Sequence, residues 1–371
     1  MANQSANIIN SSEFFYKVEE LCQNSSETNL YTRLRRVFKE YNDLIRDCQL
    51  QYPNLSPITF PLEINIRQET IILKAVMDYE SGKVEQSYEE LKGLWDIQEV
   101  WDALKIKEPQ KRTFYRARES SKPIGTKEAM FHVPFELRYR VATARFSMPG
   151  YPCLYLTKHI YTAWEEYGRA PIERMYYSRV FAPKALKLID LRLRRTFSNG
   201  KEAKTEISSY LHVIPLIIAC SLRVSQPDAQ YKYEYIIPQM LLHILIEEIS
   251  KHANDGQNKN NNLAESESSK AVSCFAKDGF DGIMYSSTKA DPLYWKPTSV
   301  NTDCIVIPVR KISNIGYCEQ LAAGFQLTKP LAFDYKWLKK MSRGTTKNET
   351  YSQSYFHLIE DELHNINLEK I

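Results

Sequence analysis

The sequence predicts an α+β fold in which an N-terminal helical domain precedes a β-sheet domain with flanking helices. Three observations support this prediction. Apolar residues recur three and four positions apart before residue 110, short segments rich in Tyr, Val, Ile and Phe replace that pattern after it, and helical stretches lie between those segments. With 371 residues, the chain is long enough for two domains, one of which can bury a full core.

Three segments predict the helical domain. Residues 28–50 carry one apolar stripe, as in a helix of about six turns. A second helical stretch covers 71–79, after a break marked by three prolines, and a third covers 87–106. Because each helix has one apolar face, the helices must pack on one another or on the rest of the chain. We expect the stripe in 28–50 to pack within the chain, and a homodimer seam is the alternative.

The remaining elements follow in order after residue 111. The predicted strands are 112–118, 152–156, 175–181, 283–285 and 303–309. Helices are expected at 159–167, 235–251 and 352–371. The polar, low-complexity segment 253–270 is predicted to be a surface loop that lies outside any ligand-binding cleft. The domains are therefore a helical domain (1–110), a sheet domain (111–310) and a partly helical C-terminal extension (311–371).

Composition excludes several classes of protein. The net charge is +4, from 49 basic and 45 acidic residues, without the basic stripe that nucleic-acid binding needs. The most apolar run, 210–223, contains His212 and Pro215 and is too short to span a bilayer, so we expect it to be a buried core segment. The first residues do not resemble a signal peptide. Seven scattered cysteines without a C-x-x-C pair indicate reduced thiols and no zinc site. We expect a cytoplasmic protein without metal, nucleic acid or membrane as a partner.

Common catalytic signatures are absent. The 12 glycines form neither G-x-G-x-x-G nor a P-loop, which argues against a classical dinucleotide-binding fold. The H-E-x-x-H, G-x-S-x-G and kinase signatures are also missing.

Four short polar blocks carry the candidate site residues. In the first, F-Y-R-A-R, Arg116 follows an aromatic residue on the first strand. In the second, Arg145 precedes a Pro-Gly turn and the Leu-Tyr-Leu strand that contains Tyr155. In the third, T-A-W-E-E, Glu166 lies eleven residues after that tyrosine. In the fourth, D-G-I-M-Y-S-S, Ser287 ends a Tyr-x-Ser that follows Asp-Gly-Ile.

In this order the four blocks resemble the RES family, which is named for its Arg, Glu and Ser, over roughly the middle half of the chain. The resemblance implies a fold related to ADP-ribosyltransferases, in which a split mixed β-sheet clamps NAD in a cleft. Members break down NAD by hydrolysis or phosphorolysis, or transfer ADP-ribose to a protein, and several are toxins paired with an antitoxin. The implied function is that of an NAD-degrading bacterial toxin or defence effector. NAD is its substrate, and an antitoxin or regulatory protein is its partner.

Carried over residue by residue, the resemblance makes Glu166, Arg116 and Ser287 catalytic. It assigns NAD binding to Arg116, Arg145, Tyr155 and Ser287. The chemistry of these side chains is compatible with such roles. Nicotinamide leaves the ribose as a neutral molecule, so the reaction needs a fixed carboxylate to stabilise the ribosyl cation rather than an acid. Guanidinium groups suit the pyrophosphate because they stay charged and donate two parallel bonds.

Several alternatives remain open at the level of sequence. Glu165 adjoins Glu166, Ser286 adjoins Ser287, and Arg118 alternates with Arg116 on one strand face. Taken alone, the glutamates are typical of a polar helix face and the arginines of a solvated sheet edge. A protein ADP-ribosyltransferase is one alternative function. A catalytically silent binding module that keeps the fold is another.

Overall fold

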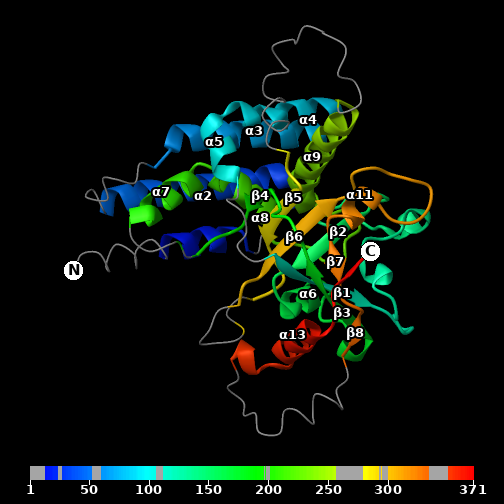
Figure 1. Cartoon of the computed structure of the whole chain (residues 1–371). Helices are drawn as coiled ribbons and strands as arrows, with labels where there is room; N and C mark the ends of the chain where they lie inside the picture. Colours follow the sequence, from blue (N-terminus) through cyan, green and yellow to red (C-terminus); the bar gives the residue numbers. More distant parts are fainter. Residues whose placement is uncertain are drawn as a thin grey trace. The chain divides into compact units, whose positions relative to one another are not determined.

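The computed structural model describes residues 13–23, 27–51, 60–105, 112–195, 197, 201–255, 279–291, 294, 300–333 and 350–371. Over these residues the chain is an α+β protein in which N-terminal helices precede a β-sheet flanked by helices, as the sequence predicts (Figure 1). Two compact units divide the chain. The helical unit comprises 1–105, 144–146 and 189–279, and the sheet unit comprises 106–143, 147–188 and 280–371.

The helical unit is built from amphipathic helices that share a core. Its described helices include α2 (Leu30–Gln51), α3 (Leu62–Glu80), α4 (Val84–Lys92), α5 (Gln98–Leu104), α7 (Lys201–Leu211), α8 (Ile214–Ser221) and α9 (Ile236–Asp255). The predicted stripe of α2 is buried within the chain, with Leu30, Leu34 and Val37 fully inaccessible to solvent. The single helix predicted over 87–106 is wrong. A 3-10 turn at Gly93–Asp96 and an extended Ile97 separate α4 from α5, because glycine favours the end of a helix over its interior.

The helical unit also contains a segment that the sequence assigned to the sheet domain. All eight residues of α8 are buried, which confirms the predicted core segment. Because α8 is apolar on every side, it must be surrounded, and it packs against α3 and α9. The segment 189–279 therefore groups with the N-terminal helices, which differs from the predicted boundaries of 111–310.

Helix α9 is longer than the sequence predicts. It continues to Asp255, so residues 253–255 of the predicted polar loop are helical. The rest of that loop lies outside the described residues. Among the described helices, none has the length and apolar character needed to cross a membrane.

The sheet unit contains all five predicted strands, each within one residue at either end. The strands are β1 (Thr113–Glu119), β2 (Cys153–Thr157), β3 (Met175–Phe181), β5 (Gly282–Ser286), β6 (Asp303–Pro308), β7 (Gln326–Leu327), β8 (Leu331–Ala332) and β9 (Glu369–Lys370). They lie in the order β5-β6-β2-β1-β3-β7-β9, with β8 also pairing with β3. A further strand, β4 (Leu188–Leu191), crosses the boundary between the two units. Its first residue, Leu188, belongs to the sheet unit, and residues 189–191 belong to the helical unit.

The C-terminal residues are part of the sheet unit rather than a separate extension. Strands β7 and β8 pair with β3, and β9 pairs with β7. The predicted last helix is α13 (Tyr355–Asn365), which is shorter than expected because the chain then leaves the helix to form β9. Strands β7, β8 and β9 have two residues each, which is too few for an alternating pattern to reveal them in the sequence.

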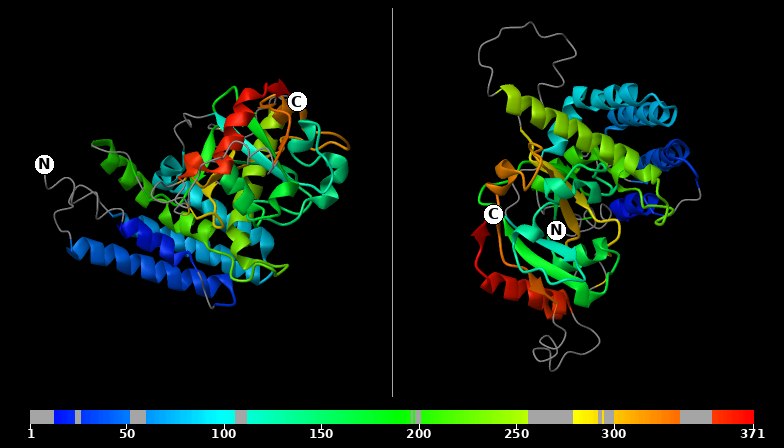
Figure 2. Two further views of the ribbon diagram at one scale, coloured as in Figure 1. Left: turned by 90° about the horizontal axis from the view of Figure 1, so that it is seen from below. Right: turned by 90° about the vertical axis from the view of Figure 1, so that its right-hand side faces the viewer.

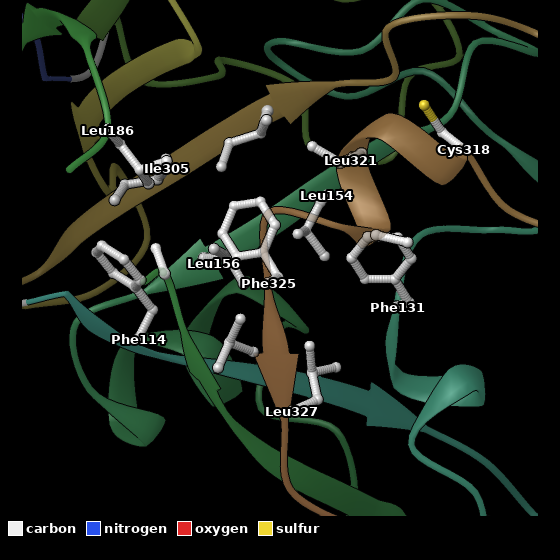
Figure 3. Packing of buried hydrophobic residues seen from close by; sticks show 14 of the residues in the cluster. Phe114, Phe131, Leu154, Leu156, Leu186, Ile305, Cys318, Leu321, Phe325 and Leu327 are labelled. Atoms are coloured by element: carbon white, nitrogen blue, oxygen red, sulfur yellow. The ribbon is translucent and has the colours of Figure 1, made fainter. Parts of the chain in front are cut away.

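Different side chains cover the two faces of the sheet. One face carries Phe114, Leu154 and Ile305, which pack against Phe131 and against Phe325 after helix α11 (Glu319–Ala322) (Figure 3). The other face is covered by helix α6 (Ile160–Glu166), which contacts β1, and by α13 (red in Figures 1 and 2), which contacts α6 and β3. The sheet is therefore a buried layer between two cores.

The sheet is split between β1 and β2. Strand β1 pairs with β3 along its whole length, from Thr113 to Glu119. Strand β2 likewise pairs with β6 along its whole length. The two central strands, β1 and β2, are paired at one position only, where Tyr115 lies opposite Thr157. Beyond that pair the end of β1 that carries Arg116 separates from β2, as expected for a split sheet.

Candidate active site

Backbone groups exposed by the split are bonded by side chains. Arg116 Nη1 donates to the Tyr155 carbonyl oxygen across the gap, at 3.2 Å. Tyr167, which follows α6, donates its hydroxyl to the Ala117 carbonyl at 3.2 Å. These bonds replace the missing ladder, because buried carbonyl groups need hydrogen-bond donors. Arg116 Nε is buried without a hydrogen-bond partner in the described part of the chain, so this guanidinium retains an unused donor.

Two arginines concentrate positive charge in the split. Arg116 and Arg118 share one face of β1, as their spacing requires. Neither forms an ion pair with a carboxylate of the described residues. Arg118 Nη2 approaches the Phe131 carbonyl at 3.5 Å. Burial lowers the pKa of Arg118, and the charge of Arg116 lowers it further. A site with two unneutralised guanidinium groups is suited to an anion such as a pyrophosphate.

A neutral histidine lies near these arginines. His132 Nε2 accepts from the Cys318 backbone N–H at 2.9 Å, so its proton resides on Nδ1, which donates to the Val133 carbonyl at 2.7 Å. Burial lowers the pKa of His132 to about 4, and the charges of Arg116 and Arg118 also lower it. The ring is fully committed to two backbone groups, which gives this histidine a structural role.

Ser287 and Glu166 are brought together from distant segments. Ser287 directly follows β5, and Glu166 is the last residue of α6. The Ser287 hydroxyl oxygen accepts from the backbone N–H groups of Lys289 at 3.2 Å and Ala290 at 3.0 Å. Its proton is donated to Glu166 Oε1. Because two amides occupy the lone pairs of the hydroxyl oxygen, the hydroxyl proton is directed at the carboxylate.

Lys289 completes the surroundings of this carboxylate. Its Nζ donates to the Glu166 carbonyl oxygen at 2.7 Å and lies 3.9 Å from Glu166 Oε2. The Glu166 side chain is 29% exposed, so part of it remains open to solvent. Cys304 Sγ on β6 lies 3.9 Å from Glu166 Oε1. Burial raises the pKa of the Cys304 thiol well above its usual range, and Glu166 raises it further, so the thiol is neutral.

Glu165 is used differently from its neighbour. Its side chain is 4% exposed, and its carboxylate bonds Arg169 Nε at 3.0 and 3.1 Å. Consecutive helical residues point about 100° apart, which explains why Glu165 and Glu166 have different partners. Ser286 is the last residue of β5, where it pairs with Asp303 of β6. The geometry therefore favours Glu166 over Glu165, and Ser287 over Ser286.

The pKa of Tyr155 is affected by both charged parts of the site. Burial raises its pKa well above the ordinary range. The charge of Glu166 raises this pKa further and that of Arg116 lowers it, so both groups lie close enough to act on the ring. The phenol therefore stays protonated, and its hydroxyl also forms a hydrogen bond with the Ser147 side chain. Its ring can serve as a packing surface.

Arg145 belongs to the helical unit. It is 7% exposed, and its Nη1 and Nη2 donate to the carbonyl oxygens of Cys220 at 2.9 Å and Leu222 at 2.8 Å, at the C-terminal end of α8. The guanidinium also lies 5.2 Å from the ring centroid of Tyr235. These contacts satisfy helix-terminal carbonyls and favour a structural role. The predicted role of Arg145 in NAD binding stays a prediction.

The chain is similar to a protein of Bacillus subtilis (strain 168) named "Putative toxin YopC". The two are 32% identical over 236 residues, which span 60% of this chain. The aligned region covers 46% of that protein, so the chain spans about half the length of the relative it matches. No family model matches the chain. No solved structure matches it.

Three further residues of the site have no motif that would single them out. Tyr167, Lys289 and Cys304 reach Ala117 or Glu166 only because α6, β1, β5 and β6 meet there. Lys289 follows the predicted serine by two positions, which is the one local signal that the sequence offered. Within the described ranges, no group of three His, Cys, Asp or Glu side chains is arranged to hold a metal ion.

Proposed function

We propose that the sheet unit cleaves the bond between nicotinamide and ribose in NAD, by hydrolysis or phosphorolysis. The observation that supports this proposal best is the hydrogen bond from Ser287 to Glu166, beside a split that contains two arginines without carboxylate partners. A fixed, partly exposed carboxylate and positively charged side chains for the pyrophosphate are the two features that a dinucleotide glycosidase needs.

In the proposed reaction, the bond between the ribose C1′ and the pyridinium nitrogen breaks, and its electron pair goes to that nitrogen. Nicotinamide leaves as a neutral molecule, and the positive charge passes to the ribose ring. Glu166 stabilises this cation, while the Ser287 hydroxyl holds the carboxylate in place. Water then attacks C1′ and releases one proton to the solvent, or hydrogen phosphate attacks C1′ through an anionic oxygen and no proton is lost. Arg116 and Arg118 bind the pyrophosphate, and Tyr155, whose pKa responds to both Arg116 and Glu166, packs against the substrate.

The proposed biological role is that of a bacterial toxin or defence effector, because loss of NAD stops the metabolism of a cell. The name of the similar Bacillus subtilis protein supports this role. A protein that destroys NAD inside its own cell needs an inhibitor, so an antitoxin or regulatory protein is the proposed partner.

Incubation of the purified chain with NAD, with and without inorganic phosphate, tests the proposal. We expect free nicotinamide together with ADP-ribose, or with a phosphorylated ADP-ribose when phosphate is the acceptor. The Ser287→Ala variant should release nicotinamide at least about tenfold more slowly, because it leaves the carboxylate without its donor. ADP-ribose bound to a protein would identify a transferase instead. A folded chain that binds NAD without releasing nicotinamide would identify a binding module.

A further inference from the structure

A buried carboxylate of the last helix lies at the start of the helix that carries Glu166. Glu360 of α13 is 4% exposed, and its Oε1 accepts from the Ile160 backbone N–H at 2.8 Å. The Tyr351 hydroxyl donates to the same oxygen at 2.6 Å. His159 Nδ1 lies 3.3 Å from both carboxylate oxygens, and His357 Nδ1 lies 3.6 Å from Oε2. Four groups from two segments therefore converge on one side chain.

Helix α6 lacks a cap of its own. The side chain of His159, its N-cap residue, makes no capping hydrogen bond. The first N–H groups of any helix need an outside acceptor, and a negative charge at that end is favourable because of the helix dipole. Glu360, 200 positions along the chain, supplies both the acceptor and the charge. A residue that is remote in sequence thus does what a Ser, Thr or Asp does locally in most helices.

The short length of α6 couples its two ends. The helix has seven residues, from the Ile160 amide that Glu360 binds to Glu166, so it extends only about 10 Å. Phe356 of α13 also contacts its outer side, with ring centroids 5.8 Å from Tyr161 and 5.3 Å from Trp164. Because α6 is held at its first amide and along one side, a displacement of its start moves its last residue with it.

We propose that Glu360 is a positioning residue that places the Glu166 carboxylate against Ser287 by anchoring the start of α6. This inference deepens the proposed NAD cleavage and rests on it for its kinetic part. It also gives the last 22 described residues, 350–371, a defined role in the site. Glu360 is buried at the end of α6 opposite Glu166, so its effect should fall on turnover rather than on binding.

The test compares Glu360→Ala and Glu360→Gln with Asp361→Asn, an exposed neighbour on the same helix whose side chain is 62% exposed. Two properties are measured on the full chain: kcat and KM for NAD, and hydrogen–deuterium exchange of the backbone amides in 158–168. In Glu360→Ala we expect kcat to fall at least about tenfold with KM within about twofold, because the carboxylate is misplaced. Amide exchange in 158–168 should rise in the same variant. Glu360→Gln keeps an oxygen for the Ile160 N–H, so it should restore most of the protection and of kcat. Asp361→Asn should match the parent.

Parent-like exchange in 158–168 for Glu360→Ala would overturn the proposal. A folded Glu360→Gln variant with the same amide exchange and the same kcat as Glu360→Ala would also overturn it. If the alanine variant does not fold, the comparison of Glu360→Gln with the parent takes its place. A rise in KM with unchanged kcat would also overturn it, because binding rather than positioning would be affected. If the parent does not consume NAD, the proposed function fails, whereas the exchange measurement still shows whether Glu360 anchors α6.

Discussion

The Ser287 hydroxyl is oriented by atoms that take no part in the proposed chemistry. Two backbone amides of the turn after β5 occupy its lone pairs, and its one proton therefore points to Glu166. The neighbouring glutamate has the same chemistry but is paired with Arg169. At this scale the surroundings, rather than the residue type, separate a candidate catalytic group from a structural one.

The spacing of the blocks in the sequence predicted Glu166 and Ser287, and it could not have predicted what holds them. Lys289 and Glu360 act through their positions in the fold, which no local pattern encodes. Arg145 shows the opposite case. A match in sequence order placed it with the NAD-binding groups, whereas its guanidinium bonds carbonyl groups at the C-terminal end of α8.

The two predicted NAD-binding arginines should respond differently to substitution by lysine. Arg116→Lys should slow NAD consumption with a nearly unchanged melting temperature, because Arg116 bonds a single carbonyl. Arg145→Lys should lower the melting temperature, because it breaks a two-pronged buried contact that is worth roughly 1–3 kcal/mol. Thermal unfolding and NAD assays of both variants check this pair. An Arg145→Lys protein with an unchanged melting temperature and no activity would show that Arg145 acts in NAD binding rather than in stability.

His132 should make stability depend on pH. Its pKa of about 4 in the folded chain lies below the ordinary value near 6.5, so the unfolded chain binds more protons between these values. The free energy of unfolding should therefore be highest above pH 6.5 and fall as the pH drops towards 4, by up to ~3 kcal/mol from this group. Urea unfolding at pH 7 and pH 4.5 measures the difference. His132→Gln, which does not titrate, should show a smaller difference, and equal differences would exclude His132 as the cause.

At the scale of elements, the strands of the sheet place the site. The longer strands and α6 followed from residue type and periodicity, which is why their predicted bounds lie within one residue of the structure. The short strands β7, β8 and β9 arise only because the edge strand next to them offers unpaired backbone groups. The interruption between α4 and α5 likewise depends on packing that an apolar pattern does not reveal.

Glycine 282 is required for the close pairing of β5 with β6. A Cβ at Gly282 would overlap the Val306 carbonyl oxygen and crowd Ile307, and backbone atoms cannot move away cheaply. Gly282→Ala should therefore cost roughly 1–3 kcal/mol of stability and displace Ser287, which directly follows the strand. Gly125→Ala is the matched control, since nothing lies within 4 Å of its added Cβ. Melting temperatures and NAD turnover of both variants check this. Equal melting temperatures would show that β5 lies further from β6 than the structure indicates.

At the scale of the whole molecule, the chain enters each compact unit more than once. Residues 144–146 and 189–279 belong to the helical unit, although the sheet unit precedes and follows them. A single domain boundary placed where the composition changes, near residue 110, cannot predict that later segments belong to the helical unit. The apolar character of α8 on every side was the one sequence signal that it needed a surrounding core, and that core consists of helices α3 and α9.

The central claim is that a carboxylate held by Ser287 drives the cleavage of NAD, and the two adjacent glutamates offer its most direct test. The measurement is the rate of nicotinamide release from NAD by the parent, Glu166→Gln and Glu165→Gln, with melting temperatures recorded for all three. Glu166→Gln keeps the size of the side chain but loses its charge, so we predict a loss of about a hundredfold or more with little change in melting temperature. Glu165→Gln should retain most of the activity, because Glu165 is paired with Arg169 away from Ser287. Parent-like activity of Glu166→Gln, or a larger loss in Glu165→Gln, would contradict the account.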